Sequence, residues 1–177
     1  MKNLSNQGPD LPKTLIRDAA DSDYNRIIYL NACEIQYTSA MDIDRARHLD
    51  SLSDYHRVAE VNGHVAAFIL AMKDHVPYVN DNYRWFSERY ERFLYIDRIV
   101  VDRPYQGLKI GTLLYRDIVD YARKENIPVI TCEIMIEPPN KRSLDFHARQ
   151  GFKEIGIRSV ENDSVKYSMQ AMPVTAV

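Results

Sequence analysis

The sequence has few of the residues that crosslink or interrupt a small fold. Its two cysteines, Cys33 and Cys132, lie far apart without a C-x-x-C spacing, so neither a disulfide framework nor a structural zinc site is indicated. The five histidines show no metal-ligand spacing, which leaves a metal hydrolase without support. Six glycines and eight prolines in 177 residues are too few for a low-complexity chain.

Long apolar runs and an excess of one charge are also absent. No stretch approaches the roughly 20 apolar residues of a membrane span. The polar residues 1–14, with Pro9 and Pro12, lack the apolar core of a secretory signal. The 23 basic and 25 acidic residues leave a net charge of -2, which gives no whole-molecule attraction to nucleic acid or to an anionic membrane. We therefore expect a cytoplasmic protein whose partners are small molecules, with no nucleic acid and no membrane.

What is present is typical of one globular domain. Hydrophobic residues make up 45% and charged residues 27% of the chain, and the length suffices for one buried core. We expect a flexible N-terminal segment at residues 1–14, a single domain at residues 15–172 and a tail at residues 173–177. No internal repeat is visible.

The first half of the chain alternates strand and helix patterns. Residues 15–17 predict a short strand, and Asp21 or Ser22 is expected to cap the helix that follows, although Asn31 interrupts its apolar face. A second, weaker helix pattern spans residues 42–54. Residues 55–61 and 64–72 predict a hairpin, because the Asn62-Gly63 dipeptide between them tolerates the positive φ angles of a type I′ turn.

Residues 74–92 break this pattern by mixing aromatic with charged residues. A loop of this length in a compact domain is typically functional or contains a short helix, which we expect over residues 84–92. The aromatic residues suit either a ligand lid or a cover over the sheet edge. The candidate acceptor-binding residues of the lid interpretation are Tyr78, Tyr83, Arg84 and Trp85.

The second half predicts strands at residues 93–101 and 128–135, each followed by a helix. The first helix begins near Ile110, and the second begins after Asn140 and stops at Gly151. Residues 152–160 and 164–169 predict two final strands around a turn at residues 161–163. The whole order predicts an α/β (mixed α+β) fold with helices on both faces of a mixed sheet.

The turn at residues 102–112 is a candidate anion site. A strand that passes through a glycine-containing turn into a helix presents unpaired N–H groups at the positive end of the helix dipole. Arg103 and Lys109 add positive charge, and Gly107 and Gly111 keep Cβ atoms away from the backbone. On the glycines alone, an ordinary strand-to-helix turn is the better explanation of the pattern.

Two motifs in order resemble the GNAT superfamily of acyl-CoA N-acyltransferases. The first contains Gln106, Gly107 and Gly111, similar to the family's Gln or Arg, two residues, Gly, one residue, then Gly or Ala. The second runs from Asn140 to Phe152, similar to the family's Asn, small residue, aromatic residue and closing Gly-Phe. The resemblance implies a mostly antiparallel sheet of about seven strands flanked by four helices.

The resemblance also implies acetyl-CoA as cofactor and N-acetyl transfer as activity. The backbone from Gln106 to Thr112 would hold the pyrophosphate, and strand residues Ile99 to Val101 would run beside the pantetheine arm and offer an N–H to the thioester carbonyl. The implied cofactor-binding residues are Ile99, Val100, Val101, Arg103, Gln106, Gly107, Leu108, Lys109, Ile110, Gly111, Thr112, Asn140 and Ser143. Asn140 would also cap its helix.

Two positions depart from the family pattern. Lys109 stands where the family has its middle glycine, so it either changes the loop or contacts phosphate itself. His147 stands where many members carry a tyrosine that protonates the leaving thiolate. A histidine can donate a proton near neutral pH, but a half-buried structural histidine explains the position almost as well.

Amine acetylation also requires a base. Glu133 and Asp97 are the candidates, acting directly or through water, and Glu133 ranks first because its strand lies beside the expected thioester. Either residue is also explained as a solvated strand carboxylate or an ion-pair partner. The predicted reaction is direct attack by the primary amine of a small molecule in a ternary complex.

Other functional classes fit the sequence less well. A dinucleotide-binding domain requires three spaced glycines after its first strand, and a P-loop requires Gly-Lys-Ser/Thr, neither of which is present. The alternative from another class is an acyl-CoA-binding sensor that kept this fold without catalysis. For the oligomeric state, the sequence leaves monomer and homodimer open.

Overall fold

The computed structural model describes residues 13–160 and 164–175. The expected turn at residues 161–163, residues 1–12 of the expected flexible segment and residues 176–177 of the expected tail lie outside the described residues. Seven strands form one sheet in the order β1-β2-β3-β4-β5-β7-β6. The strands are β1 (Thr14–Asp18), β2 (Tyr55–Val61), β3 (His64–Lys73), β4 (Leu94–Val101), β5 (Val129–Glu137), β6 (Lys153–Val160) and β7 (Val165–Pro173).

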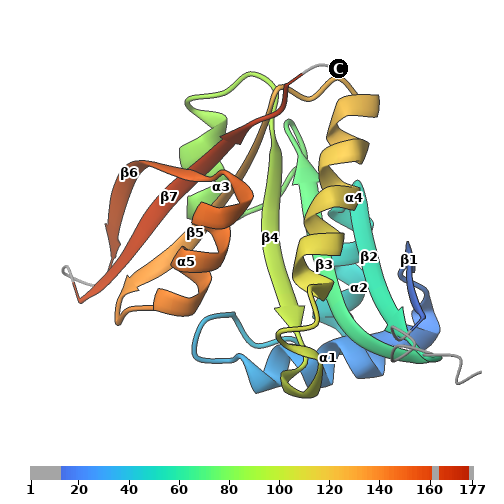
Figure 1. Cartoon of the computed structure of the whole chain (residues 1–177). Coiled ribbons are helices and arrows are strands. Elements are labelled where there is room, and N and C mark those ends of the chain that lie inside the picture. The colour runs from blue at the N-terminus through green and yellow to red at the C-terminus, as the bar shows by residue number, and fades with distance from the viewer. Residues whose placement is uncertain (1–12, 161–163, 176–177) are drawn as a thin grey trace, which may run out of the picture.

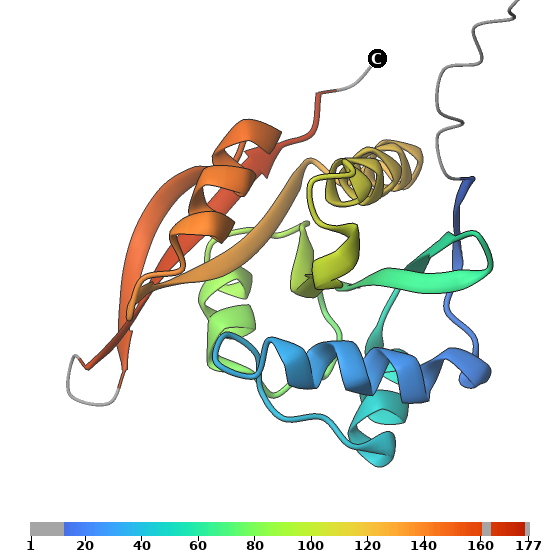
Figure 2. The same ribbon diagram turned by 60° about the horizontal axis from the view of Figure 1, so that its bottom comes forward.

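Five α-helices in the described ranges cover this sheet, where the sequence predicted four. They are α1 (Tyr24–Cys33), α2 (Ile43–Leu52), α3 (Asp81–Ser87), α4 (Ile110–Lys124) and α5 (Lys141–Gln150). Helices α4 and α5 lie on one face of the sheet, and α1 and α2 lie on the other (Figures 1 and 2). The predicted α/β fold with a mixed, mostly antiparallel sheet is confirmed.

Separate apolar clusters pack the helices against the two faces of the sheet. On the α4 face, Ile110, Leu114 and Ile118 pack against residues of β2 to β5. On the other face, α1 and α2 pack against β2 to β4, and aromatic residues of α3 pack against the middle of the sheet. Burial of these side chains is the main source of stability, at about 1.5–3 kcal/mol for each fully buried large aliphatic or aromatic residue.

Strands β4 and β5 form the one parallel pair in this sheet, and it is short. Their register contains only Leu94 opposite Ile130 and Tyr95 opposite Thr131. Beyond these pairs β4 continues along β3, and β5 continues along β7, so the two strands diverge (Figure 1). On β4 the register with β3 shifts around Asp97, which bulges between Ile96 and Arg98. Alternate backbone groups of residues 96–101 therefore face the gap without a neighbouring strand.

The hairpin was predicted correctly. Asn62 and Gly63 have φ angles of 50° and 83°, which fit a type I′ turn. Asp42 caps α2 by accepting the N–H of Arg45 at 2.8 Å. The Asn62-Gly63 dipeptide was sufficient to predict the hairpin because its effect is on the backbone of the turn itself.

Two predicted helix starts were wrong. The residue that ties down the start of α1 is Asp23 rather than Asp21 or Ser22, because its carboxylate accepts the N–H of Ala20 at 2.9 Å. The short helix expected over residues 84–92 is α3, which begins earlier. Asn80 caps it by accepting the N–H groups of Asn82 and Tyr83 at 2.8 and 3.0 Å.

None of the helices in residues 13–160 and 164–175 is both long enough and apolar enough to span a membrane.

Candidate active site

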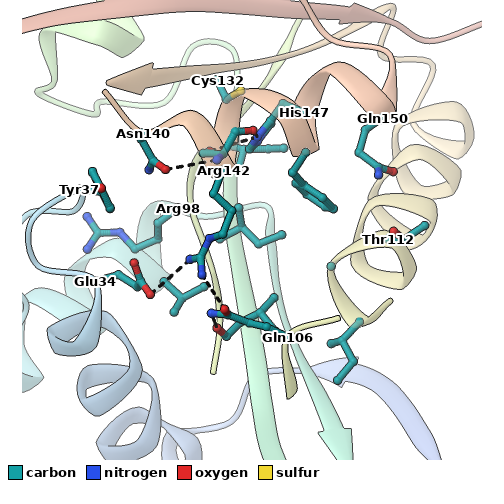
Figure 3. Close-up of a pocket in the computed structure, with 18 of the residues that line it drawn as sticks. Glu34, Tyr37, Arg98, Gln106, Thr112, Cys132, Asn140, Arg142, His147 and Gln150 are labelled. Carbon is teal, nitrogen blue, oxygen red and sulfur yellow. Dashed lines mark hydrogen bonds and ion pairs between the residues drawn. The ribbon is translucent and has the colours of Figure 1, made fainter. Parts of the chain in front are cut away.

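The diverging strands β4 and β5 open a cleft with a volume of about 430 Å³. The segment that follows α1, the turn into α4 and the helix α5 close its other sides (Figure 3). The structure brings together most of the predicted site residues in its lining: Asp97, Ile99, Val100, Val101, Gln106, Gly107, Lys109, Ile110, Gly111, Thr112, Glu133, Asn140, Ser143 and His147. Arg103 and Leu108, also predicted, do not line it.

The turn before α4 has the geometry of an anion site. The intrahelical ladder begins with the N–H of Leu113, which donates to the carbonyl of Lys109 at 3.0 Å. The preceding N–H groups of the first turn have no acceptor within the helix. Gly107 has a φ of 82°, and nothing lies within 4 Å of the position where its Cβ would be. The backbone of the turn is therefore open to a ligand, at the positive end of the helix dipole.

Lys109 takes over the conformation that a glycine would provide. Its φ of 63° and ψ of 12° place it in the left-handed region at the N-cap of α4. Gly111, in contrast, allows close packing, because a Cβ there would lie only 3.0 Å from Cζ of Phe146 on α5. Lys109 thus adopts a left-handed conformation at the position where the family pattern has its middle glycine.

Two amide side chains that line the cleft make hydrogen bonds to the backbone at the end of β4 and at the start of α5. The amide of Gln106 donates to the carbonyl of Val101 at 2.8 Å. Asn140 caps α5, as predicted, by accepting the N–H of Ser143 at 3.2 Å. The open end of the cleft is therefore framed by two polar side chains in fixed positions.

The sequence analysis missed Arg142, which crosses the cleft. Its guanidinium donates to Oε1 of Gln106 at 2.5 Å and lies 3.5 Å from Oε1 of Glu34 on the other side (Figure 3). Other lining residues that the sequence did not indicate include Tyr37, Thr38, Tyr105, Arg149 and Gln150. The second motif contains Arg142, but no local pattern indicates the direction of its side chain.

Glu133 is a half-buried residue whose carboxylate has one buried oxygen without a partner among the described residues. Its Oε1 accepts the side-chain N–H of Asn82 at 2.9 Å, whereas the buried Oε2 has no hydrogen-bond partner among the described residues. Burial, and then the charge of Asp97, raise the pKa of Glu133 to about 7. The amide of Asn82 opposes this rise, as does the nearby hydroxyl of Tyr95, which makes no hydrogen bond of acceptable geometry among the described residues. A carboxylate with these properties can accept a proton near neutral pH.

Asp97 has both oxygens occupied. One accepts the hydroxyl of Tyr78 at 2.5 Å, and the other pairs with Nε of Arg98 at 2.6 Å. Both side chains of this ion pair are almost fully buried, at 3% and 4% exposure. Asp97 therefore acts here as an ion-pair partner, one of the alternatives that the sequence left open, and Glu133 is the better placed candidate base.

His147 has both ring nitrogens engaged. Nδ1 lies 2.8 Å from the carbonyl oxygen of Ser143, to which it donates, so Nε2 accepts the hydroxyl of Tyr115 at 2.5 Å. Burial lowers the pKa of His147 to about 4, although the bond to Ser143 opposes the shift. The ring is neutral at pH 7, and a general-acid role would require it to leave a partner. The geometry favours the structural interpretation.

The predicted acceptor residues lie mostly outside the cleft. Tyr83 is buried among aromatic side chains, and its hydroxyl donates to the carbonyl of Lys73 at 2.7 Å. Arg84 is exposed and lies 3.5 Å from Asp81. Trp85 packs on β6, where its Cζ2 lies 2.8 Å from the Cβ position of Gly156. Tyr78 reaches the site through its bond to Asp97. These aromatic residues cover the sheet, the second of the two interpretations considered.

No group of three or more His, Cys, Asp or Glu side chains is placed to hold a metal ion within residues 13–160 and 164–175.

Comparisons with known proteins agree with this geometry. The sequence profile of the Acetyltransferase (GNAT) family matches residues 22–152. An uncharacterized N-acetyltransferase of Methanocaldococcus jannaschii is 30% identical over 98 residues. That alignment covers 55% of this chain, and it spans only 38% of the archaeal protein.

Solved structures share the fold at low sequence identity. Ard1 from Thermoplasma volcanium superposes with a TM-score of 0.74 at 16% identity, over 92% of this chain and 98% of that one. The NatC complex bound to Gag peptide and CoA superposes with a TM-score of 0.71 at 16% identity, over 92% and 99%. At such identities the likeness establishes the fold alone.

Proposed function

The chain belongs to the Acetyltransferase (GNAT) family, and on that premise we propose that it transfers an acetyl group from acetyl-CoA to the primary amine of a small molecule. The observation that carries the proposal is the cleft between β4 and β5, which joins an anion-binding helix start to a buried carboxylate with a free oxygen. The first feature suits the phosphates of coenzyme A, and the second suits the deprotonation of an amine.

The residues of the cleft fit coenzyme A. The first-turn N–H groups of α4 and the open backbone at Gly107 would hold the pyrophosphate, with Lys109 and Arg142 supplying positive charge. Asn140 and the free edge of β4 would contact the pantetheine arm. When bound, acetyl-CoA supplies the acetyl group in activated form, as a thioester.

Glu133 would receive the proton of the acceptor amine. Its free Oε2 is buried at the narrow end of the cleft, next to the last paired residues of β4 and β5. The neutral amine would then attack the thioester carbonyl carbon directly, so that a C–N bond forms and the C–S bond breaks. The thiolate would leave with its electron pair and take up the proton that the acylated nitrogen loses. Asp97, held by Tyr78 and Arg98, would fix the shape of this end of the cleft and keep Glu133 protonated until near neutral pH.

Acetyl-CoA consumption tests the proposal. We expect release of free thiol from acetyl-CoA when the protein is incubated with a panel of small-molecule amines, and we expect loss of this release in Glu133→Gln with CoA binding retained. The panel should include a peptide with a free N-terminus, since preference for it would overturn the small-molecule assignment. Stabilisation by acetyl-CoA should precede turnover, because a ligand at 100 times its Kd adds about 2.7 kcal/mol to the free energy of unfolding.

One observation favours a second candidate function, a non-catalytic acyl-CoA sensor. His147 stands at the position of the family's usual proton donor, and both its nitrogens are engaged elsewhere. A sensor would bind acetyl-CoA and release no thiol with any amine of the panel. Binding together with turnover would exclude it.

A further inference from the structure

A chain of hydrogen bonds leads from Glu133 on β5, through an amide side chain, to β6 at the edge of the sheet. The amide nitrogen of Asn82, near the start of α3, donates to Oε1 of Glu133 at 2.9 Å. The amide oxygen of the same side chain accepts from Nη1 of Arg158 on β6 at 2.8 Å. Three elements that are distant in the sequence are therefore linked through the side chain of Asn82.

We propose that Arg158 and Asn82 are positioning residues for the base Glu133, with Arg158 setting the direction of the Asn82 amide and Asn82 holding one carboxylate oxygen so that the other faces the acceptor. This inference rests on the proposed function and adds two residues to it. Neither residue lines the cleft.

The donor and acceptor chemistry of the chain allows one arrangement only. An arginine has five N–H donors and no acceptor, so the atom of Asn82 that faces Arg158 must be the oxygen. The NH₂ group of Asn82 is then turned toward Glu133. Without Arg158, the amide is free to flip and present its oxygen to the carboxylate, which would remove the hydrogen bond. The guanidinium thus acts on Glu133 through the orientation of one amide.

Burial makes this orientation persistent. Asn82 is 9% exposed, and the side chain of Arg158 is 21% exposed. A second contact, from Nη2 of Arg158 to Asp81 at 2.9 Å, holds the guanidinium from the solvent side. Because Asp81 contacts the arginine but lies on the far side from Glu133, it provides a matched control within the same cluster.

Other charged and titratable groups also face Glu133. From β4, Asp97 raises its pKa, and Tyr95 lowers it. The thiol of Cys132 is adjacent in the chain, and Tyr78 and Arg98 act on Asp97. From β7, the residue opposite Glu133 is Met169, which has no charge, while Tyr167 packs against the same aromatic cluster. None of these groups is altered by substitutions at Asn82 or Arg158, so a change in titration is assigned to the chain itself.

The experiment is the pH dependence of kcat/KM for thiol release from acetyl-CoA, with an amine that the panel identifies. We expect Asn82→Leu to shift the acid limb of this profile, the fall in kcat/KM at low pH, to higher pH by about one unit. Hydrogen bonds to a charged carboxylate stabilise its ionised form and lower its pKa by roughly one to two units, and this variant removes one of them. Arg158→Met should move the limb in the same direction by a smaller amount. Arg158→Lys, which retains a charged donor, should restore the wild-type position of the limb.

The control is Asp81→Asn, which breaks the outer contact of Arg158 and should leave the limb unchanged. A purely structural role of Asn82 would lower protein yield or kcat with no movement of the limb, and that result would overturn the inference. If Asp81→Asn moves the acid limb as far as Asn82→Leu does, the inference is also overturned, because a general charge effect would then explain both shifts.

A second measurement separates this inference from the proposed function. The titration of the Glu133 carboxyl carbon by ¹³C NMR requires no turnover. If the wild-type protein releases no thiol but Asn82→Leu raises the NMR midpoint of Glu133, the proposed function fails and the positioning chain stands. If the wild-type protein is active and Asn82→Leu leaves both the NMR midpoint and the acid limb in place, the positioning chain fails alone.

Discussion

The burial of Glu133 should make the protein less stable at the pH at which the base is ionised. Its pKa is raised from an ordinary 4.5 to about 7 in the folded protein. Between these values the folded state holds a proton that the unfolded state has lost, so stability falls as pH rises. At 1.36 kcal/mol per pKa unit, the ionised carboxylate costs the folded state about 3 kcal/mol above pH 7.

Glu133→Gln removes this cost while retaining the shape of the side chain. The amide oxygen of a glutamine can still accept from Asn82. We therefore expect the variant to be more stable than the wild-type protein at pH 8, by about 3 kcal/mol relative to their difference at pH 4.5. The substitution expected to abolish activity should thus strengthen the fold.

Urea unfolding followed by circular dichroism from pH 4.5 to 8.5 measures this difference. The pH profile of the wild-type protein alone is not sufficient, because His147 acts in the opposite direction. The pKa of His147 is lowered from 6.5 to about 4, so the unfolded state binds the extra proton and stability rises with pH over that window. His147 is present in both proteins, and its contribution cancels in the difference. A stability difference that stays constant from pH 4.5 to 8.5 would refute the reasoning about Glu133.

Three other substitutions test separate parts of the site. Arg98→Met should cost about 3–5 kcal/mol in urea unfolding, because it leaves the buried Asp97 without its cation; a loss below about 1 kcal/mol would contradict the importance of this ion pair. Lys109→Gly should leave stability unchanged or raise it by up to about 1 kcal/mol, since the left-handed backbone suits glycine, and calorimetry should show weaker CoA binding whose deficit shrinks in high salt. Affinity equal to that of the wild-type protein at low salt would remove Lys109 from the phosphate site. His147→Gln should keep kcat within about threefold, whereas a fall of roughly 100-fold or more would restore His147 as the general acid.

Local signals predicted most of the fold. The Asn62-Gly63 turn and the cap at Asn140 depend on backbone within a few residues, and each is found where the sequence placed it. The strand-turn-helix at residues 94–124 was also predicted, since its pattern lies in one continuous segment. Lys109 replaces the family's middle glycine because its backbone adopts the left-handed conformation. The sequence could not show this, since only glycine and proline indicate backbone conformation by their identity.

Long-range partners account for what the sequence did not show. Asn31 interrupts the apolar face of α1 because its oxygen accepts from Arg98 at 2.9 Å and its nitrogen donates to the carbonyl of Ser39 at 2.9 Å. Arg98 thereby ties the segment after α1 to β4 at the edge of the cleft. The contact between Asn82 and Glu133 spans 51 residues. Neither pair has a local pattern that reveals it.

The aromatic segment before β4 shows the limit of composition as evidence. Aromatic and charged residues mixed in one loop suit a ligand lid and a cover over the sheet equally well. The start of α3 at Asp81 decides between them, because it turns Tyr83 and Phe86 toward β4 and leaves Arg84 in solvent. A helix beginning at residue 84 would have placed different side chains inside.

The proposed role of Glu133 as the base of an acetyl transfer in the cleft between β4 and β5 is tested most directly by measuring kcat/KM for thiol release against pH, in the wild-type protein and in Glu133→Gln. The wild-type value should fall tenfold per pH unit below about 7, the pKa of Glu133. The variant should be at least about 100-fold slower at pH 8 and should lack this acid limb. An unchanged limb and rate in Glu133→Gln would contradict the account.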